Sequence, residues 1–414
     1  MRLLKNRFSL LLLILIPILS LFIGFIFNED LSTGGSKWDF NLTWTVVEKY
    51  SNLEFEDANE YTRHFPLHYF FLSFSHSIFN DQKLVRLFYL IFSFSLPIFL
   101  FLNLIKIYKF KEINLIIFSF SFLLIPLYRA EAIWANSHLT ATIFFLIGNF
   151  FYLKSLEKNI FYFKLINLFF LALATYCLQT YVILYLYYLS KYFLNEKFRV
   201  FTSLFLFSCL LGIPGLYFIY LNPRTSNLTI TQDFYYTFIT NISIMFFFLC
   251  FLLCNLKTIK ALKNEIFILK FWEILILFIV AGFVLINLDF NLLKSNLKGG
   301  GFFFKLSHFI LKNNLIFIMS FLIGLFVSAL IIKKEKKIFF IFLIMFLMAL
   351  NFQIYQKYFE PLFLVMFCVL YKNFLLSNIL NNLKNILSFY SLIVIYFIIA
   401  YINYLNNFSH KLVI

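Results

Sequence analysis

Apolar runs alternate with short polar segments along the whole chain. A membrane core about 30 Å thick is crossed by a helix of about 20 residues, and apolar runs near that length recur from one end to the other. The runs are continuous instead of alternating apolar and polar with a period of two, which favours helices over strands. About thirteen helices are predicted by this pattern. They cover residues 9–27, 84–105, 113–127, 138–153, 160–177, 180–194, 200–220, 236–254, 268–288, 314–332, 338–351, 358–371 and 386–404.

The predicted fold is therefore an all-α polytopic membrane protein with a single transmembrane domain over residues 1–414. Residues 1–27 are expected to stay as a first helix, because they lack a small-residue cleavage site. No large soluble domain is expected after residue 404. The segment 66–79 is short for a crossing, so it either crosses or lies in the interface.

The distribution of Lys and Arg predicts which ends of the helices are cytoplasmic, because short basic loops stay on that side. Basic residues gather in the N-terminus and in the segments 106–112, 154–159, 191–199, 255–265, 333–337 and 371–385. The alternate segments then face outward: 28–83, 128–137, 221–235, 289–313 and 352–357. Of these, 28–83 is a long first outer loop with juxtamembrane helices, and 289–313 is the second long one.

Composition agrees with a membrane protein and excludes a soluble domain, since 62% of the residues are hydrophobic, 13% are charged and the mean hydropathy is +0.87. The net charge of +16 falls in the connecting loops, where topology and anionic lipid explain it without a nucleic-acid partner. Phosphate-loop, dinucleotide and zinc-protease signatures are absent. We expect a bacterial inner membrane, with the endoplasmic reticulum as the alternative.

Ionisable residues in three outer segments are the candidate functional residues, because a charge at the membrane is costly unless it is paired or used. They are expected to converge on one cavity. They are Glu29, Asp30, Asp39, Arg63, His64 and His68 in the first segment, Arg129, Glu131 and His138 in the second, and Lys357 and Glu360 in the third.

Several short motifs resemble one known family. One motif is His64-Phe65-Pro66-Leu67-His68-Tyr69, which is similar to an H-P-P-L-Y-Y pattern and follows Asp39 at a suitable distance. A second is Ala130-Glu131-Ala132-Ile133, which is similar to a Q-E-A-R pattern. The third is YQKYFEPLFLVM at 355–366, which is similar to the tyrosine, basic residue and proline near the last helices of the family. These motifs resemble the GT-C superfamily of membrane glycosyltransferases, especially protein O-mannosyltransferases and the lipid A aminoarabinose transferase (glycosyltransferase family 39). Departures are Phe40 in place of the second acid of an Asp-Glu pair, Phe65 in place of a proline, and Ile133 in place of the arginine.

The resemblance implies transfer of a sugar from a polyprenyl-phosphate donor to a glycan, lipid or protein acceptor. Such chemistry needs a base for the acceptor and positive charge for the departing phosphate. Asp39 is the candidate base, with helix capping as its alternative role, and Glu131 is a second catalytic candidate. Glu29 and Asp30 are second choices as the base. The candidates for donor binding are Trp38, Arg63, His64, His68, Arg129 and Lys357.

Three questions stay open from the sequence. His64 and His68 could bind a divalent metal together with a carboxylate, or only form hydrogen bonds. An envelope polysaccharide polymerase or ligase is one alternative function, although such a protein usually has its largest outer loop in its second half. A flippase or transporter of lipid-linked sugars is the other, and it would show an internal repeat or broken helices.

Overall fold

The structure of the chain is a computed structural model. It describes residues 7–32, 35–55, 64–222, 234–253, 255–266, 270–288, 301–349 and 356–412. Every regular element in these residues is a helix, as the sequence predicts. The contacts between Cα atoms divide the chain into two compact units, Met1–Asn227 with Ile393–Ile414, and Leu228–Leu392. The expectation of a single transmembrane domain stays a prediction.

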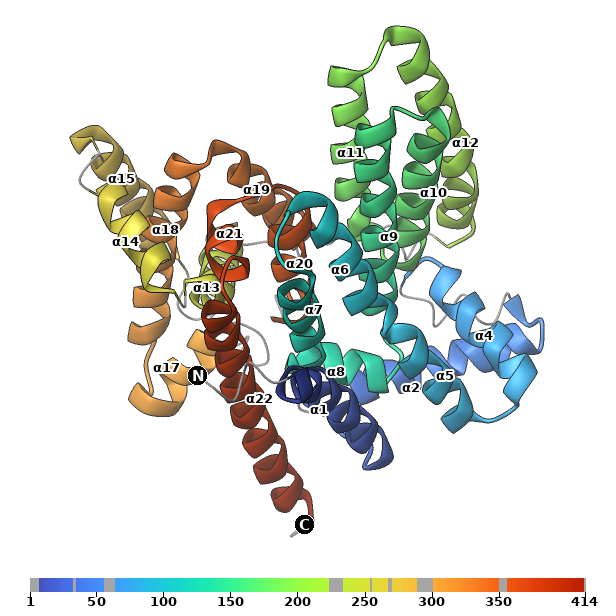
Figure 1. The fold of residues 1–414 in the computed structure, drawn as a ribbon. Helices are drawn as coiled ribbons and strands as arrows, with labels where there is room; N and C mark the ends of the chain where they lie inside the picture. The colour runs from blue at the N-terminus through green and yellow to red at the C-terminus, as the bar shows by residue number, and fades with distance from the viewer. Residues whose placement is uncertain are drawn as a thin grey trace. The chain divides into compact units, whose positions relative to one another are not determined.

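In the described residues, the first unit contains thirteen helical elements before the chain enters the second unit. They are α1 (Arg7–Ile26), α2 (Gly35–Ser51), α4 (Leu67–Phe79), α5 (Gln82–Ser93), α6 (Ser95–Ile107), α7 (Glu112–Ser121), η2 (Phe122–Leu124), α8 (Pro126–Ile133), α9 (Ser137–Lys158), α10 (Phe161–Cys177), η3 (Gln179–Tyr181), α11 (Val182–Asn195) and α12 (Phe198–Leu221). The long helices α9 to α12 lie side by side, with α10 in contact with the other three (Figure 1).

The second unit is built around the buried helix α13, which packs on α17 and α18. Its elements are α13 (Phe234–Leu252), α14 (Leu256–Ile266), α15 (Phe271–Ile286), α17 (Gly301–Leu311), α18 (Leu315–Lys334), η5 (Lys336–Ile338), α19 (Phe339–Met348), η6 (Gln356–Tyr358), α20 (Leu362–Val369) and α21 (Phe374–Leu380). The last helix, α22 (Leu383–Leu412), begins in this unit and ends in the first one.

Six helices in the described residues are long and apolar enough to cross a membrane. They occupy Gln82–Ile107, Ser137–Lys158, Phe198–Leu221, Phe234–Leu252, Leu315–Lys334 and Leu383–Asn406. Three further pairs of helices pass the same test but are bent within the pair, which raises the number to nine if each pair is one span. The predicted count of about thirteen is therefore not confirmed. Apolar composition is compatible with an integral membrane protein.

Part of the difference in count arises because hydropathy alone does not register a bend, and part because α10, α11 and α19 are shorter than 18 residues. The predicted run 113–127 becomes α7 and η2, and the chain then turns by 69° into α8. The run 268–288 is bent by 101° from the helix before it, and the run 358–371 by 89° from α21. The apolar helix α19 has only 10 residues.

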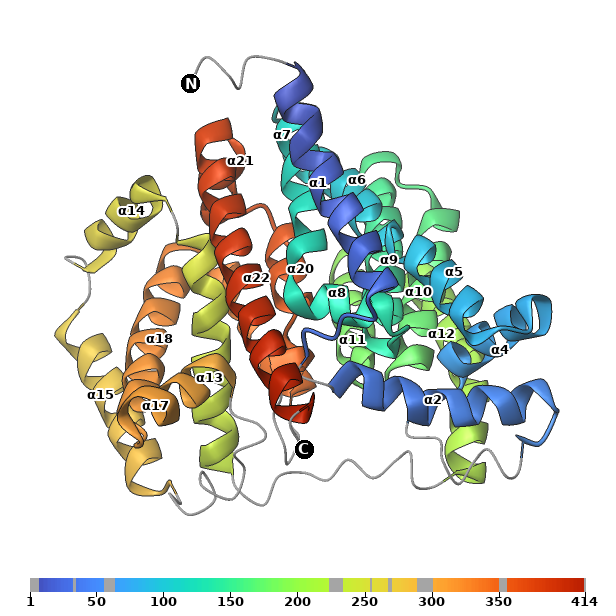
Figure 2. The same ribbon diagram turned by 90° about the horizontal axis from the view of Figure 1, so that it is seen from below.

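The segment 28–83, predicted as the first outer loop, contains the helices α2 and α4 in its described residues, and its place outside the membrane stays a prediction. Helix α2 turns away from α1 and packs on α4 (Figure 2). Helix α4 has 13 residues and is not among the candidate spans of the described chain. Of the second predicted outer loop, residues 289–300 lie outside the described residues, and α17 begins at Gly301.

Candidate functional site

Helix α8 carries two of the predicted site residues, Arg129 and Glu131, in the interior of the first unit. Ile125 has an extended backbone (φ −66°, ψ 123°), which is the conformation that a following proline favours, and Pro126 then starts the helix where its missing N–H is not needed. All 8 residues of α8 are buried. The sequence predicted an outer loop over 128–137, but most of that segment is this buried helix and its end, which carry Arg129, Glu131 and Trp134.

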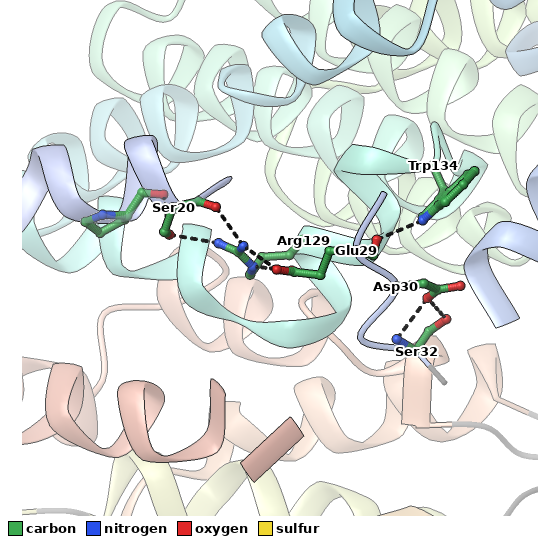
Figure 3. Close-up of polar contacts among 7 residues, drawn as sticks. Ser20, Glu29, Asp30, Ser32, Arg129 and Trp134 are labelled. Carbon is green, nitrogen blue, oxygen red and sulfur yellow. Dashed lines mark hydrogen bonds and ion pairs between the residues drawn. The ribbon is translucent and has the colours of Figure 1, made fainter. Parts of the chain in front are cut away.

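Arg129 and Glu29 form a buried ion pair that ties α8 to the chain just after α1. The Nε and Nη2 atoms of Arg129 donate to the two carboxylate oxygens of Glu29 at 2.8 and 3.0 Å (Figure 3). Nη1 and Nη2 donate to the hydroxyl and the carbonyl oxygen of Ser20, both at 2.9 Å. The guanidinium also lies 4.7 Å from the ring centre of Phe397. Every guanidinium nitrogen of Arg129 thus has a partner within the protein.

Asp30 and Ser32 position the start of α2. The backbone N–H of Ser32 donates to Oδ1 of Asp30 at 3.0 Å (Figure 3). The backbone N–H of Lys37 donates to Oδ2 of Asp30 at 2.9 Å. The N–H of Ser36 donates to the hydroxyl of Ser32 at 2.6 Å. A carboxylate near the first turn of a helix also interacts favourably with the helix dipole. Asp30, expected as a second-choice base, therefore anchors α2 in this structure.

Trp38 and Asp39 lie on α2, one turn after this anchor. The side chain of Trp38 is exposed and that of Asp39 is half-buried, whereas Glu29, Asp30 and Glu131 are all buried. The neighbouring Phe40 is buried and packs on Trp134, with ring centres 5.9 Å apart. Of the predicted acidic candidates in this unit, Asp39 is thus the one that a molecule from outside the protein can reach.

His68 is buried in a polar network between α4, α5 and the start of α9. Its Nδ1 lies 3.0 Å from the hydroxyl of Thr140, and its Nε2 lies 2.9 Å from the carbonyl oxygen of Ala135. The hydroxyl of Tyr89 joins the network at 2.8 Å from Thr140. Burial lowers the pKa of His68 from its ordinary value of 6.5 to about 4, against a raising effect of the Ala135 carbonyl. The imidazole is neutral at pH 7, so it does not supply charge for a phosphate.

Glu131 and His64 lie at the edges of this network. Glu131 interacts electrostatically with the hydroxyl of Tyr181, so the two side chains lie near each other, and that hydroxyl shares a hydrogen bond with Thr142. The half-buried His64 has its Nδ1 3.3 Å from the side-chain oxygen of Gln179. The two predicted segments around 64–68 and 129–138 are therefore brought together, with η3 beside them.

The other predicted residues are not part of this cluster. Arg63 lies outside the described residues. Lys357 is half-buried in η6 of the second unit, as part of the third predicted segment with the buried Glu360. Among the described residues, no group of three or more His, Cys, Asp and Glu side chains could hold a metal ion. The divalent metal that the sequence left open stays untested.

Arg86 is the residue that the sequence analysis missed. Its guanidinium carbon lies 3.7 Å from the ring centre of Trp134, 5.4 Å from that of Phe25 and 5.8 Å from that of Phe40. Its Nε donates to the carbonyl oxygen of Ile133, and its Nη1 to the side-chain oxygen of Asn28, both at 2.9 Å. The available signal was a charged residue inside the apolar run 84–105, and such a residue is a functional candidate by default.

Comparison of the chain with protein-family models, with curated proteins and with solved structures finds no match. The function is therefore inferred from the residues of the site itself.

Proposed function

We propose that this protein is an integral membrane glycosyltransferase that moves a sugar from a polyprenyl-phosphate donor to a glycan, lipid or protein acceptor. The observation that supports the proposal most is that described residues of three segments far apart in sequence, 28–32 with 35–40, 64–68 and 126–140, meet in the first unit. Together they provide acidic residues, histidines and exposed aromatic surface at the end of apolar helices. These are the groups that the family resemblance leads us to expect.

Asp39 is the base in this proposal. A base must reach the hydroxyl or amine of the acceptor, and Asp39 is only half-buried, whereas Glu29 and Asp30 are buried. Trp38, exposed beside Asp39, offers an aromatic face on which a sugar ring can stack. Glu131 is retained as a second catalytic candidate, since its position near Tyr181 lies within the same polar network.

Under this proposal the N-terminus is cytoplasmic and the site faces the periplasm of a bacterial inner membrane. The support for this orientation is the gathering of Lys and Arg in alternate connecting segments.

Replacement of Asp39 by Asn tests the proposal in the cell of origin. We expect loss of one envelope glycan and accumulation of its lipid-linked sugar, both measured by mass spectrometry on extracts with equal amounts of the protein in the membrane. Glu48→Gln is the matched control, because Glu48 is an exposed acid on the same helix and glutamine can still accept the hydrogen bond from Trp44. Unchanged glycans in the Asp39→Asn strain would reject Asp39 as the base.

A flippase is the second candidate, because α7 and α8 form a bent pair that carries buried charges, and broken helices are typical of transporter sites. The two functions differ in what purified protein does in vesicles. A transferase forms a new glycosidic product from lipid-linked sugar and acceptor, whereas a flippase only moves the lipid-linked sugar between leaflets. Movement without product would favour the flippase.

A further inference from the structure

Arg86 carries a buried positive charge that the protein satisfies only in part. Its side chain is 6% exposed, and its Nε and Nη1 donate to a backbone carbonyl and to an amide oxygen. Its Nη2 is buried without a hydrogen-bond partner, and no ion pair among the described residues includes Arg86. Both of its acceptors are neutral groups.

The contrast with Arg129 shows what Arg86 lacks. Both side chains are buried in the first unit, but Arg129 has a carboxylate partner and a partner for each guanidinium nitrogen. An arginine stays charged in proteins, and removing that charge from water is unfavourable unless it is paired. Stacking on Trp134 at 3.7 Å offsets part of this cost, because the face of the indole ring attracts a cation. A free Nη2 then remains for an anion.

A second cation lies over the same indole ring. The amine of Lys37 is 5.5 Å from the ring centre of Trp134, its side chain is exposed, and none of the ion pairs described includes it. Beside Lys37 in the first turn of α2, the hydroxyl of Ser36 is buried and has no hydrogen-bond partner. Two cations thus lie over one tryptophan ring, and neither has an anionic side-chain partner among the described residues.

We propose that Arg86, Lys37 and Trp134 form a binding site for a phosphate group, and that its ligand is the phosphate of the polyprenyl-phosphate donor. The identity of the ligand rests on the proposed function, whereas the site rests on the contacts above. Arginine suits phosphate because its planar N–H groups match two oxygens, and lysine adds a point charge. Lys37 precedes Trp38 and Asp39 on α2, so the helix that holds the phosphate also carries the proposed base.

This site replaces Arg129 as the expected phosphate ligand. The nitrogens of Arg129 are already engaged by Glu29 and Ser20, so that residue positions α8 against the segment after α1. Arg86 is held by the same two segments, through Asn28 and Ile133, and keeps one nitrogen available.

Trp134 provides a probe of binding that does not depend on transfer activity. The chain has four tryptophans, and changing Trp38, Trp44 and Trp272 to Phe leaves Trp134 alone. We would titrate this full-length protein, in nanodiscs of phosphatidylcholine, with a polyprenyl phosphate and separately with inorganic phosphate. We expect a saturable change in fluorescence that weakens as salt is added. Lys37→Gln and Arg86→Met should raise Kd at least tenfold, as expected for a hydrogen bond to a charged group.

The matched control is Lys83→Gln, because Lys83 is an exposed lysine one turn before Arg86 on α5 and should leave Kd unchanged. If Arg86→Met does not fold, Lys37→Gln and Arg86→Lys decide. Folded variants of Lys37 and Arg86 that bind polyprenyl phosphate as tightly as the wild type would overturn the site. If Arg86 has only a structural role, the Arg86 variants will have a lower unfolding temperature and the Lys37→Gln variant will bind with the Kd of the wild type. That result would also overturn the phosphate site.

The source of the phosphate is decided by the two titrations. Binding of the lipid at concentrations where inorganic phosphate has no effect supports the donor as ligand, and equal competition by inorganic phosphate supports the site with a soluble ligand. The result of the binding experiment can be told apart from the result of the test of the proposed function. Binding that depends on Arg86, together with unchanged glycans in the Asp39→Asn strain, keeps the site and rejects Asp39 as the base.

Discussion

The Nε of Arg129 lies 2.8 Å from a carboxylate oxygen of Glu29, although the two residues are 100 positions apart in the chain. This pair joins the segment after α1 to the buried helix α8, and both side chains are almost fully buried, at 1% and 6% exposed. The same two segments hold Arg86. The pair is therefore the point from which the stability of the candidate site can be tested.

Breaking the pair on one side should be strongly destabilising. Glu29→Gln or Arg129→Gln leaves one buried charge without its partner, which typically costs about 3–5 kcal/mol. Thermal unfolding of the purified protein in detergent measures the effect. The control is the pair Lys106–Glu157, which is 2.7 Å long but partly exposed, so Glu157→Gln should change stability by less than about 1 kcal/mol. Equal effects of Glu29→Gln and Glu157→Gln would mean that burial of the first pair does not matter.

Gly24 should tolerate no side chain, because it lies against the same ion pair. A Cβ atom there would be 2.8 Å from Nη2 of Arg129 and 2.9 Å from Oε2 of Glu29. Gly24→Ala should therefore lower stability by about 1–3 kcal/mol through overpacking. Gly212→Ala is the control within helix α12, since a Cβ there meets nothing within 4 Å. It should be neutral or raise stability by up to about 1 kcal/mol, as alanine favours a helix. The unfolding temperatures of both variants are compared with that of the wild type.

His68 should make the stability of the protein depend on pH in the acidic range. The pKa of His68 falls from 6.5 to about 4 on folding, so the unfolded chain takes up a proton before the folded one does. The contribution of His68 to the free energy of unfolding is fully present above about pH 6.5. It is lost as the pH falls toward 4, which lowers the free energy of unfolding by up to about 3 kcal/mol. Unfolding temperatures between pH 7.5 and 4.5 measure it. His68→Gln should flatten this dependence; a curve with the slope of the wild type would show that another group is responsible.

Replacement of Asn241 on α13 by leucine should stabilise the protein. Its side-chain oxygen and nitrogen are buried and have no hydrogen-bond partner among the described residues, which costs about 1–3 kcal/mol. Asn241→Leu removes this cost and should raise the unfolding temperature. The opposite is expected for Asn149→Leu, because Asn149 is also buried but donates to Asn103 at 2.7 Å and accepts from the hydroxyl of Tyr188. A fall in stability for Asn241→Leu would reveal a partner such as bound water.

The sequence determined that the chain is helical and apolar enough for a membrane, because these properties depend on local composition and on the length of each run. It also located the polar segments after α1, before α4 and at α8, since charges stand out among apolar residues. It predicted α12 to within a few residues, because no charged residue interrupts the run 200–220. The bends could not be predicted in this way, because Pro126 can start a helix as readily as it ends one.

Contacts between distant segments set which charged side chains are buried in ion pairs or helix anchors and which lie partly at the surface. Glu29, Asp30 and Asp39 look alike in the sequence, but Glu29 binds Arg129, Asp30 anchors α2, and Asp39 stays accessible. Arg86 and Arg129 differ in the same way, since only Arg129 has a carboxylate partner among the described residues. Such differences depend on contacts between distant segments, and the energy of a charge depends on its burial and its partner. Residue type and spacing along one chain do not specify either quantity.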